Sequence, residues 1–174
     1  MKTSNKTRAF FLFLDLLFFV VLVILDQITK SLAVSHLKDR PAYVLLENVF
    51  ELHYLENRGA AFGMLQNQKA LFVIIAIIML TTITYILIKI PRTKHYFALE
   101  FLLVLIASGA VGNLIDRVSL GYVVDFFYFK LIDFPIFNVA DIYVSVSCVL
   151  LAVLLVFFYK DQDFAFLNKP KKKE

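Results

Sequence analysis

Cysteine is almost absent from this chain of 174 residues, since Cys148 is the only one. A single cysteine excludes a disulfide framework and a zinc site built on cysteines. We expect Cys148 to be a buried residue of the fourth apolar stretch, because free cysteines are usually buried. The three histidines do not form the HExxH pattern of zinc peptidases, and the GxSxG pattern of serine hydrolases is missing. The sequence therefore predicts no metal site and no cofactor.

Charged residues are also scarce, at 18% of the chain, whereas hydrophobic residues make up 60% and the mean hydropathy is +0.77. Soluble domains are closer to half apolar, so these values indicate an integral membrane protein. A helix needs about 20 residues to cross a bilayer core of about 30 Å. Four apolar stretches are long enough, at residues 10–34, 71–90, 96–115 and 139–159. We expect one membrane domain with four transmembrane helices.

Basic residues cluster before the first apolar stretch, between the second and third, and after the fourth. The positive-inside rule therefore predicts that both termini face the cytoplasm, including a basic tail at residues 160–174. The first stretch is too long for the apolar part of a cleaved signal peptide, so we expect it to be retained. The net charge of +4 follows from this orientation, and we expect no nucleic-acid partner.

The two connections predicted on the outer side, residues 36–70 and 116–138, contain β-branched and aromatic residues in partial alternation. This pattern indicates short strands. Open strand edges cannot face lipid, so a sheet formed there should lie at the membrane surface or against the bundle. The expected fold class is a mainly α membrane protein with a small outer β-sheet.

Two aspartates lie in apolar surroundings, Asp125 in VVDFF and Asp141 in FNVAD. Ionisable groups near lipid are costly and often mark functional sites. Asn138 is a suitable N-cap and puts Asp141 in the first turn of the fourth helix. If the strand with Asp125 folds back over the bundle, the two carboxyls can share a proton, as in aspartic peptidases. Alternatively, Asp141 only caps its helix and Asp125 lies in solvent, and the spacing does not decide between these interpretations.

Other charged residues allow a structural interpretation. Asp26 and Lys30 are four residues apart on the first helix, which favours an ion pair. Asp15, on the same helix, has no evident partner. Asp133 lies in a loop, where we expect it to be solvated. In GNLIDR, Asp116 belongs either to a polar layer that orients the two aspartates or to an interfacial pair with the next residue.

Two hypotheses of other kinds use the same acids. The first is a small cation-binding transporter or channel subunit, since buried acids also mark ion paths. The short chain, the lack of an inverted repeat and the position of the acids at one face argue against it. The second is a metal-dependent hydrolase with the acids as ligands of a hard cation, which a chelator would inactivate.

The motifs DQITK, ENRGAAFG, GNLIDRV, GYVVDFF and FNVAD occur in an order and spacing that resemble lipoprotein signal peptidase, or signal peptidase II. The resemblance runs from the first helix to the start of the fourth. It implies a bacterial aspartic endopeptidase that cuts prolipoproteins just before a diacylglyceryl-modified cysteine. It also implies a β-cradle on the outer face, an inner-membrane location, and inhibition by globomycin-type cyclic peptides. We expect a monomer in contact with membrane lipids.

The same resemblance assigns roles to individual residues. The catalytic pair falls on Asp125 and Asp141. Ser147 stands where the family pattern has glycine. The substrate-binding or supporting residues fall on Asp26, Lys30, Asn57, Arg58, Gly59, Asn113, Asp116, Arg117 and Asn138.

Overall fold

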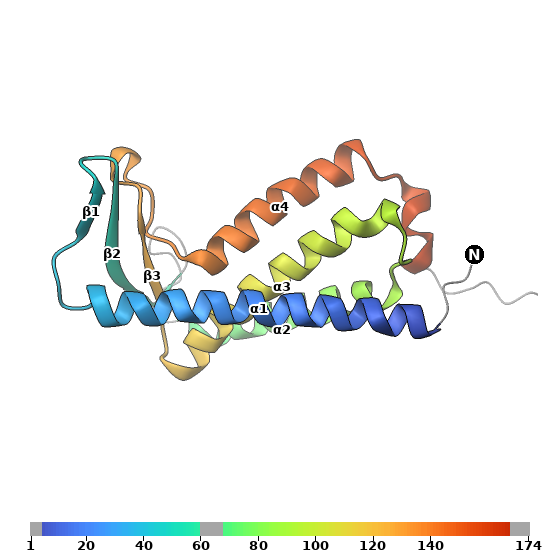
Figure 1. The fold of residues 1–174 in the computed structure, drawn as a ribbon, viewed down its shortest axis with the longest axis horizontal. Helices are drawn as coiled ribbons and strands as arrows, with labels where there is room; N and C mark the ends of the chain where they lie inside the picture. Colours follow the sequence, from blue (N-terminus) through green and yellow to red (C-terminus); the bar gives the residue numbers. More distant parts are fainter. Residues whose placement is uncertain (1–4, 60–67, 168–174) are drawn as a thin grey trace, which may run out of the picture.

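The computed structural model describes residues 5–59 and 68–167 and contains four long helices, which run side by side (Figure 1). Each is long and apolar enough to cross a membrane. The predicted mainly α fold with four membrane helices is therefore confirmed. The helices are α1 (Asn5–Leu37), α2 (Lys69–Lys89), α3 (Phe97–Ser119) and α4 (Val139–Phe157).

Helix α3 is the central helix of the bundle. In its most apolar stretch 61% of the residues are buried, against 6–11% in the other three helices. Small residues on α3 allow this close packing. A Cβ atom on Gly109 would overlap the carbonyl oxygen of Ala140 in α4, and one on Gly112 would overlap the carboxylate of Asp26 in α1. These glycines let α1 and α4 approach α3 at the level of the polar residues.

A three-stranded antiparallel sheet lies at one end of the helices, opposite the start of α1 (Figure 1). It consists of β1 (Tyr43–Leu46), β2 (Phe50–Asn57) and β3 (Val123–Tyr128), in that order. The predicted strands in both long connections are therefore confirmed. In the register of β2 and β3, Leu55 lies opposite Asp125. The short 3-10 helix η3 (Lys130–Ile132) follows β3 and leads towards α4. Residues 60–67 of the first predicted loop lie outside the described residues.

The other end of the bundle is closed by the short 3-10 helices η2 (Lys94–Tyr96) and η4 (Asp161–Leu167). We expected residues 160–174 to form a tail, but Phe164 and Phe166 of η4 pack against the helix core. The hydroxyl of Tyr96 donates a hydrogen bond to the carbonyl oxygen of Asp163 at 2.7 Å. The segment packs against the bundle and does not extend as a tail, because burial of its aromatic side chains is energetically favourable. The remaining tail residues, 168–174, lie outside the described residues.

Two expectations about single residues in the helices were wrong. Asp15 has partners, since Arg92 donates hydrogen bonds to both Asp15 and Glu100 of α3. We call these three residues the Arg92 cluster. Cys148 is exposed on α4 and not buried in the bundle. On a membrane helix an exposed side chain faces lipid, which suits a weakly polar thiol as well as a protein core does.

Candidate active site

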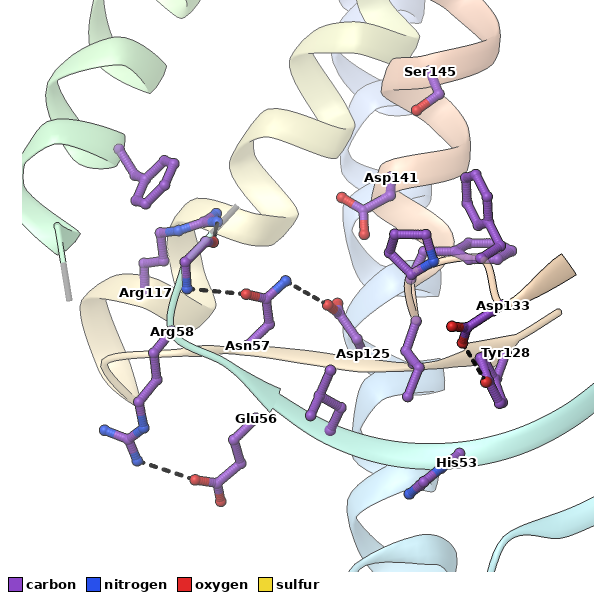
Figure 2. A pocket seen from close by; sticks show the side chains of 17 residues that line it. His53, Glu56, Asn57, Arg58, Arg117, Asp125, Tyr128, Asp133, Asp141 and Ser145 are labelled. Atoms are coloured by element: carbon purple, nitrogen blue, oxygen red, sulfur yellow. Dashed lines mark hydrogen bonds and ion pairs between the residues drawn. The ribbon is translucent and has the colours of Figure 1, made fainter. Parts of the chain in front are cut away.

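A cavity of about 860 Å³ lies where the sheet meets the ends of the helices. Its walls come from β2, β3, the starts of α2 and α4, the end of α3, and the loop before α4. Both Asp125 and Asp141 line it (Figure 2). The fold therefore brings together two acids from separate elements, and we call this space the aspartate cavity.

The carboxyl of Asp125 is completely buried and accepts two hydrogen bonds. The side-chain amide of Asn57 donates to it at 2.8 Å, and that of Asn138 donates at 2.6 Å. Burial raises the pKa of Asp125 to about 7, and the negative charge of Asp141 adds to this effect. Hydrogen bonds from the two amides act in the opposite direction. The interpretation that places Asp125 in solvent was therefore wrong, and this carboxyl exchanges a proton near neutral pH.

Asp141 lies in the first turn of α4 and forms a capping box with Asn138. The backbone N–H of Asp141 donates to Asn138 Oδ1 at 2.9 Å, and the backbone N–H of Asn138 donates to Asp141 Oδ2 at 3.1 Å. The predicted N-cap is confirmed. The second oxygen, Asp141 Oδ1, accepts from the amide of Asn113 at 2.8 Å. Capping is thus only part of its role, because this carboxyl also faces the aspartate cavity.

Asn113 and Asn138 connect the two acids. The amide of Asn138 donates to Asp125 and also to Asn113 Oδ1 at 3.1 Å, while Asn113 donates to Asp141. An amide has one accepting and one donating end, so these contacts fix which way each amide points. The two amides hold both carboxyls in a fixed relation.

Lys30 lies behind this layer, with its side chain only 3% exposed. Its ammonium contacts Asp26 at 2.9 Å, Asp116 at 3.1 Å and Asn113 Oδ1 at 2.8 Å. The predicted pair of Asp26 with Lys30 is confirmed. Of the two interpretations of Asp116, the pair with Arg117 is wrong, because the carboxylate of Asp116 binds Lys30 in the polar layer behind the aspartates. We call Asp26, Lys30 and Asp116 the Lys30 cluster.

The two carboxylates of the Lys30 cluster also bind backbone. Asp26 accepts from the N–H of Ala140 at 2.9 Å, and Asp116 accepts from the N–H of Val124 at 3.1 Å. These residues directly precede Asp141 and Asp125. One buried lysine thus joins two carboxylates that each hold the backbone next to one acid of the cavity.

Gln27 is a polar residue of this site that the sequence reasoning missed. Its amide donates to Asp26, to the carbonyl oxygen of Gly112 and to Asp116, at 3.1–3.2 Å. The available signal was its place within DQITK, directly beside Asp26.

The ENRG segment closes one side of the aspartate cavity. Asn57 Oδ1 accepts from the backbone N–H of Gly59 at 3.0 Å, so the same side chain stabilises the turn after β2 and binds Asp125. Arg117 donates to the carbonyl oxygen of Gly59 at 3.2 Å and lies over the ring of Phe72. Arg58 instead pairs with Glu56, away from Asp125 (Figure 2).

Asp133 was expected in solvent, and it is exposed, but it also lines the aspartate cavity. The hydroxyl of Tyr128 donates to its carboxylate at 2.7 Å. Its backbone has a φ of +48°, a left-handed conformation that aspartate tolerates better than most residues. Among residues 5–59 and 68–167, no group of three or more His, Cys, Asp or Glu is placed to hold a metal ion.

The family model for signal peptidase (SPase) II matches residues 18–157. The chain belongs to the signal peptidase II family. A lipoprotein signal peptidase of Caldanaerobacter subterraneus subsp. tengcongensis is 46% identical over 78% of this chain and 90% of its own length. One of Clostridioides difficile is 43% identical over 83% and 96%. A solved bacterial membrane enzyme matches with a TM-score of 0.74 and 31% identity, covering 92% of this chain and 93% of its own. A second has a TM-score of 0.72 and 33% identity, covering 83% and 94%.

This membership confirms the expected activity: the chain is a multi-pass membrane protease of an aspartic peptidase family that removes signal peptides from prolipoproteins. The comparisons give no support to the transporter or channel hypothesis.

Proposed function

We propose that Asp125 and Asp141 are the catalytic pair, and that the enzyme cuts the bond before the diacylglyceryl-modified cysteine of its substrates. The observation that carries this proposal is that both carboxyls line the aspartate cavity and are linked through Asn138 and Asn113. Each of the four carboxyl oxygens accepts one hydrogen bond from a side-chain amide or a backbone N–H, and water and the substrate carbonyl approach the pair from the aspartate cavity.

In the first step Asp141 acts as the general base. It lies at the start of α4, where the helix dipole favours a negative charge. Asp125 begins protonated, since its pKa near 7 leaves much of it neutral at physiological pH. Asp141 takes a proton from water while the water oxygen bonds to the scissile carbonyl carbon. Asp125 gives its proton to the carbonyl oxygen, which produces a tetrahedral diol.

In the second step the roles reverse. Asp141 returns its proton to the scissile nitrogen as the carbon–nitrogen bond breaks, and one hydroxyl of the diol returns a proton to Asp125. The products are the carboxyl end of the signal peptide and the free amine of the lipidated cysteine. Both acids recover their starting protonation, so no metal ion or cofactor enters the balance.

The other residues of the site act by positioning. The Lys30 cluster, Asn113 and Asn138 hold the catalytic pair, which agrees with their contacts to its carboxyls and backbone. Asn57, Gly59 and Arg117 form the wall against which the substrate backbone lies. Arg58 keeps Glu56 at the rim of the same wall.

The proposed topology has the aspartate cavity on the outer face of the cytoplasmic membrane and both termini inside. The positive-inside rule supports it, because Lys89, Lys94 and Lys160 lie at the helix ends opposite the sheet (Figure 1). At the outer boundary the acyl chains of a substrate can stay in lipid while water reaches the scissile bond. We also propose that the enzyme works as a monomer in contact with membrane lipids, and that globomycin-type cyclic peptides inhibit it by occupying the aspartate cavity.

Incubation of the purified enzyme with a diacylglyceryl prolipopeptide tests the catalytic pair. We expect Asp125→Asn and Asp141→Asn to be folded and inactive, because each role needs an ionisable carboxyl. Asp39→Asn, a change in the loop after α1, should cleave like the wild type, and a chelator should not alter the rate. Cleavage by either active-site variant would remove that residue from the pair, and inhibition by the chelator would favour the metal-dependent hydrolase.

A further inference from the structure

The aspartate cavity has two chemically different ends. On one side of the aspartates it is bounded by residues of the membrane helices, Phe72 of α2 and Ser145, which lies one turn beyond Asp141 in α4. On the other side it is bounded by the sheet and the following loop, which contribute His53, Tyr128 and Asp133 (Figure 2). One end therefore opens towards the bundle and the other towards the sheet.

This difference sets the direction in which a substrate lies, given the proposed function on which this inference rests. The part of the substrate before the scissile bond is an apolar signal segment that remains in the membrane. The part after the bond belongs to the mature protein and leaves for water. The signal segment should therefore lie along the helix end of the cavity, and the residues after the cysteine should pass the sheet end.

The carboxylate of Asp133 lies at the sheet end of the aspartate cavity. Tyr128 donates a hydrogen bond to it at 2.7 Å and so fixes its orientation. The lysine of the neighbouring 3-10 helix, Lys130, is already paired, since it binds Glu51 at 2.7 Å. None of the ion pairs among residues 5–59 and 68–167 involves Asp133. Its negative charge therefore faces the substrate path without compensation.

We infer that Asp133 is a specificity-determining residue, which favours a lysine or arginine over an aspartate or glutamate at the first positions after the lipidated cysteine. An extended chain advances about 3.3 Å per residue, so the first two or three positions after the cysteine lie within about 10 Å of the scissile bond. At a separation of about 6 Å in water, one pair of unit charges changes an equilibrium constant about threefold. Attraction for lysine and repulsion of glutamate together give a preference of up to about tenfold.

The test compares three diacylglyceryl prolipopeptides that differ only in the second residue after the cysteine, which is lysine, glutamine or glutamate. We expect wild type to cleave the lysine peptide about three to ten times faster than the glutamate peptide, as kcat/KM at low salt. Asp133→Asn should bring this ratio close to one, and high salt should lower it in wild type. The ratio is read within one variant, so a general loss of activity does not imitate the effect.

Asp39→Asn is the matched control, because Asp39 has a similar left-handed backbone, with a φ of 58°, but does not line the aspartate cavity. It should keep the wild-type ratio. Tyr128→Phe should give an intermediate ratio, because the charge remains but is no longer held. A wild-type ratio near one, or an unchanged ratio in Asp133→Asn, would overturn the inference and leave the catalytic proposal standing. Failure of wild type to cleave any of the three peptides would refute the proposed function and this inference with it.

Discussion

Replacing Lys30 with methionine tests whether the Lys30 cluster positions Asp125 and Asp141, the proposed catalytic pair. The change keeps most of the side-chain volume but removes the ammonium that contacts Asp26, Asp116 and Asn113. Asp26 is fully buried and Asp116 nearly so, and both would lose their cationic partner. Removing one partner of a buried ion pair costs on the order of 3–5 kcal/mol. For a protein of this size that corresponds to a fall in Tm of at least about 6 °C.

The same change should reduce catalysis beyond its effect on stability. Without Lys30, Asn113 Oδ1 loses the charged one of its two donors and keeps only Asn138, so the amide that binds Asp141 is held less firmly. A hydrogen bond to a charged group contributes about 1.5–3 kcal/mol, which corresponds to a loss of about 10- to 100-fold in kcat/KM. The rate is measured well below the Tm of the variant, so that unfolding does not contribute.

Lys38 provides the control, because it pairs with Glu56 at 3.1 Å in a much more exposed setting. Exposed pairs of this kind add little to stability, so Lys38→Met should leave both Tm and activity close to wild type. Equal and small effects of Lys30→Met and Lys38→Met would refute the view that the Lys30 cluster holds the site together.

Three further changes test other parts of the structure. In the proposed mechanism catalysis uses protonated Asp125, so kcat/KM should fall about tenfold per pH unit above pH 7. The raised pKa also means that ionisation of Asp125 lowers the stability of the folded state, an effect that is absent below about pH 4 and complete above about pH 7. Asp125→Asn should therefore have a higher Tm than wild type at pH 8–9 and a similar Tm at low pH, and a difference that does not change with pH would contradict this. Ser147→Ala should stabilise the protein by about 1 kcal/mol, because the buried hydroxyl of Ser147 has no hydrogen-bond partner among the described residues. Ser108→Ala should not stabilise it, because the hydroxyl of Ser108 donates to a backbone carbonyl. The free energies of unfolding of the two variants, measured by chemical or thermal unfolding, test this difference. Gly112→Ala should lower both Tm and activity, because its Cβ would overlap the Asp26 carboxylate, and a wild-type Tm would show that α1 can shift freely.

Much of the fold could be predicted because membrane helices are specified by local composition. Length and hydropathy identify the four spans, and alternation of β-branched and aromatic residues identifies the strands. The N-cap of α4 could also be predicted, since Asn138 and Asp141 are three residues apart and bind each other directly. Each of these features is decided within one continuous segment of the chain, a helix, a strand or a single turn.

Contacts between distant segments could not be predicted in the same way. Asp15 binds Arg92, which is 77 residues away in the sequence, and Gln27 donates a hydrogen bond to Asp116, which is 89 residues away. The two interpretations of Asp116 stayed open for the same reason, because its spacing does not show that Lys30 of α1 lies opposite it. The exposure of Cys148 depends on which face of α4 meets α3, and a helix that is apolar all round does not reveal this.

The Lys30 cluster and the Arg92 cluster explain how a membrane protein can build a site from two separate elements. Burial of apolar surface drives association weakly within lipid, so small residues and polar contacts must hold the helices together. In this protein the Lys30 cluster does so at the end near the sheet, where Asp26 of α1 and Asp116 of α3 bind the backbone just before Asp141 and Asp125. The Arg92 cluster does so at the other end, again between α1 and α3. With α1 and α3 joined at both ends, any shift between them would move β3 and α4 relative to each other. The buried charges therefore set the separation of the two aspartates, which apolar packing against lipid would leave loosely defined.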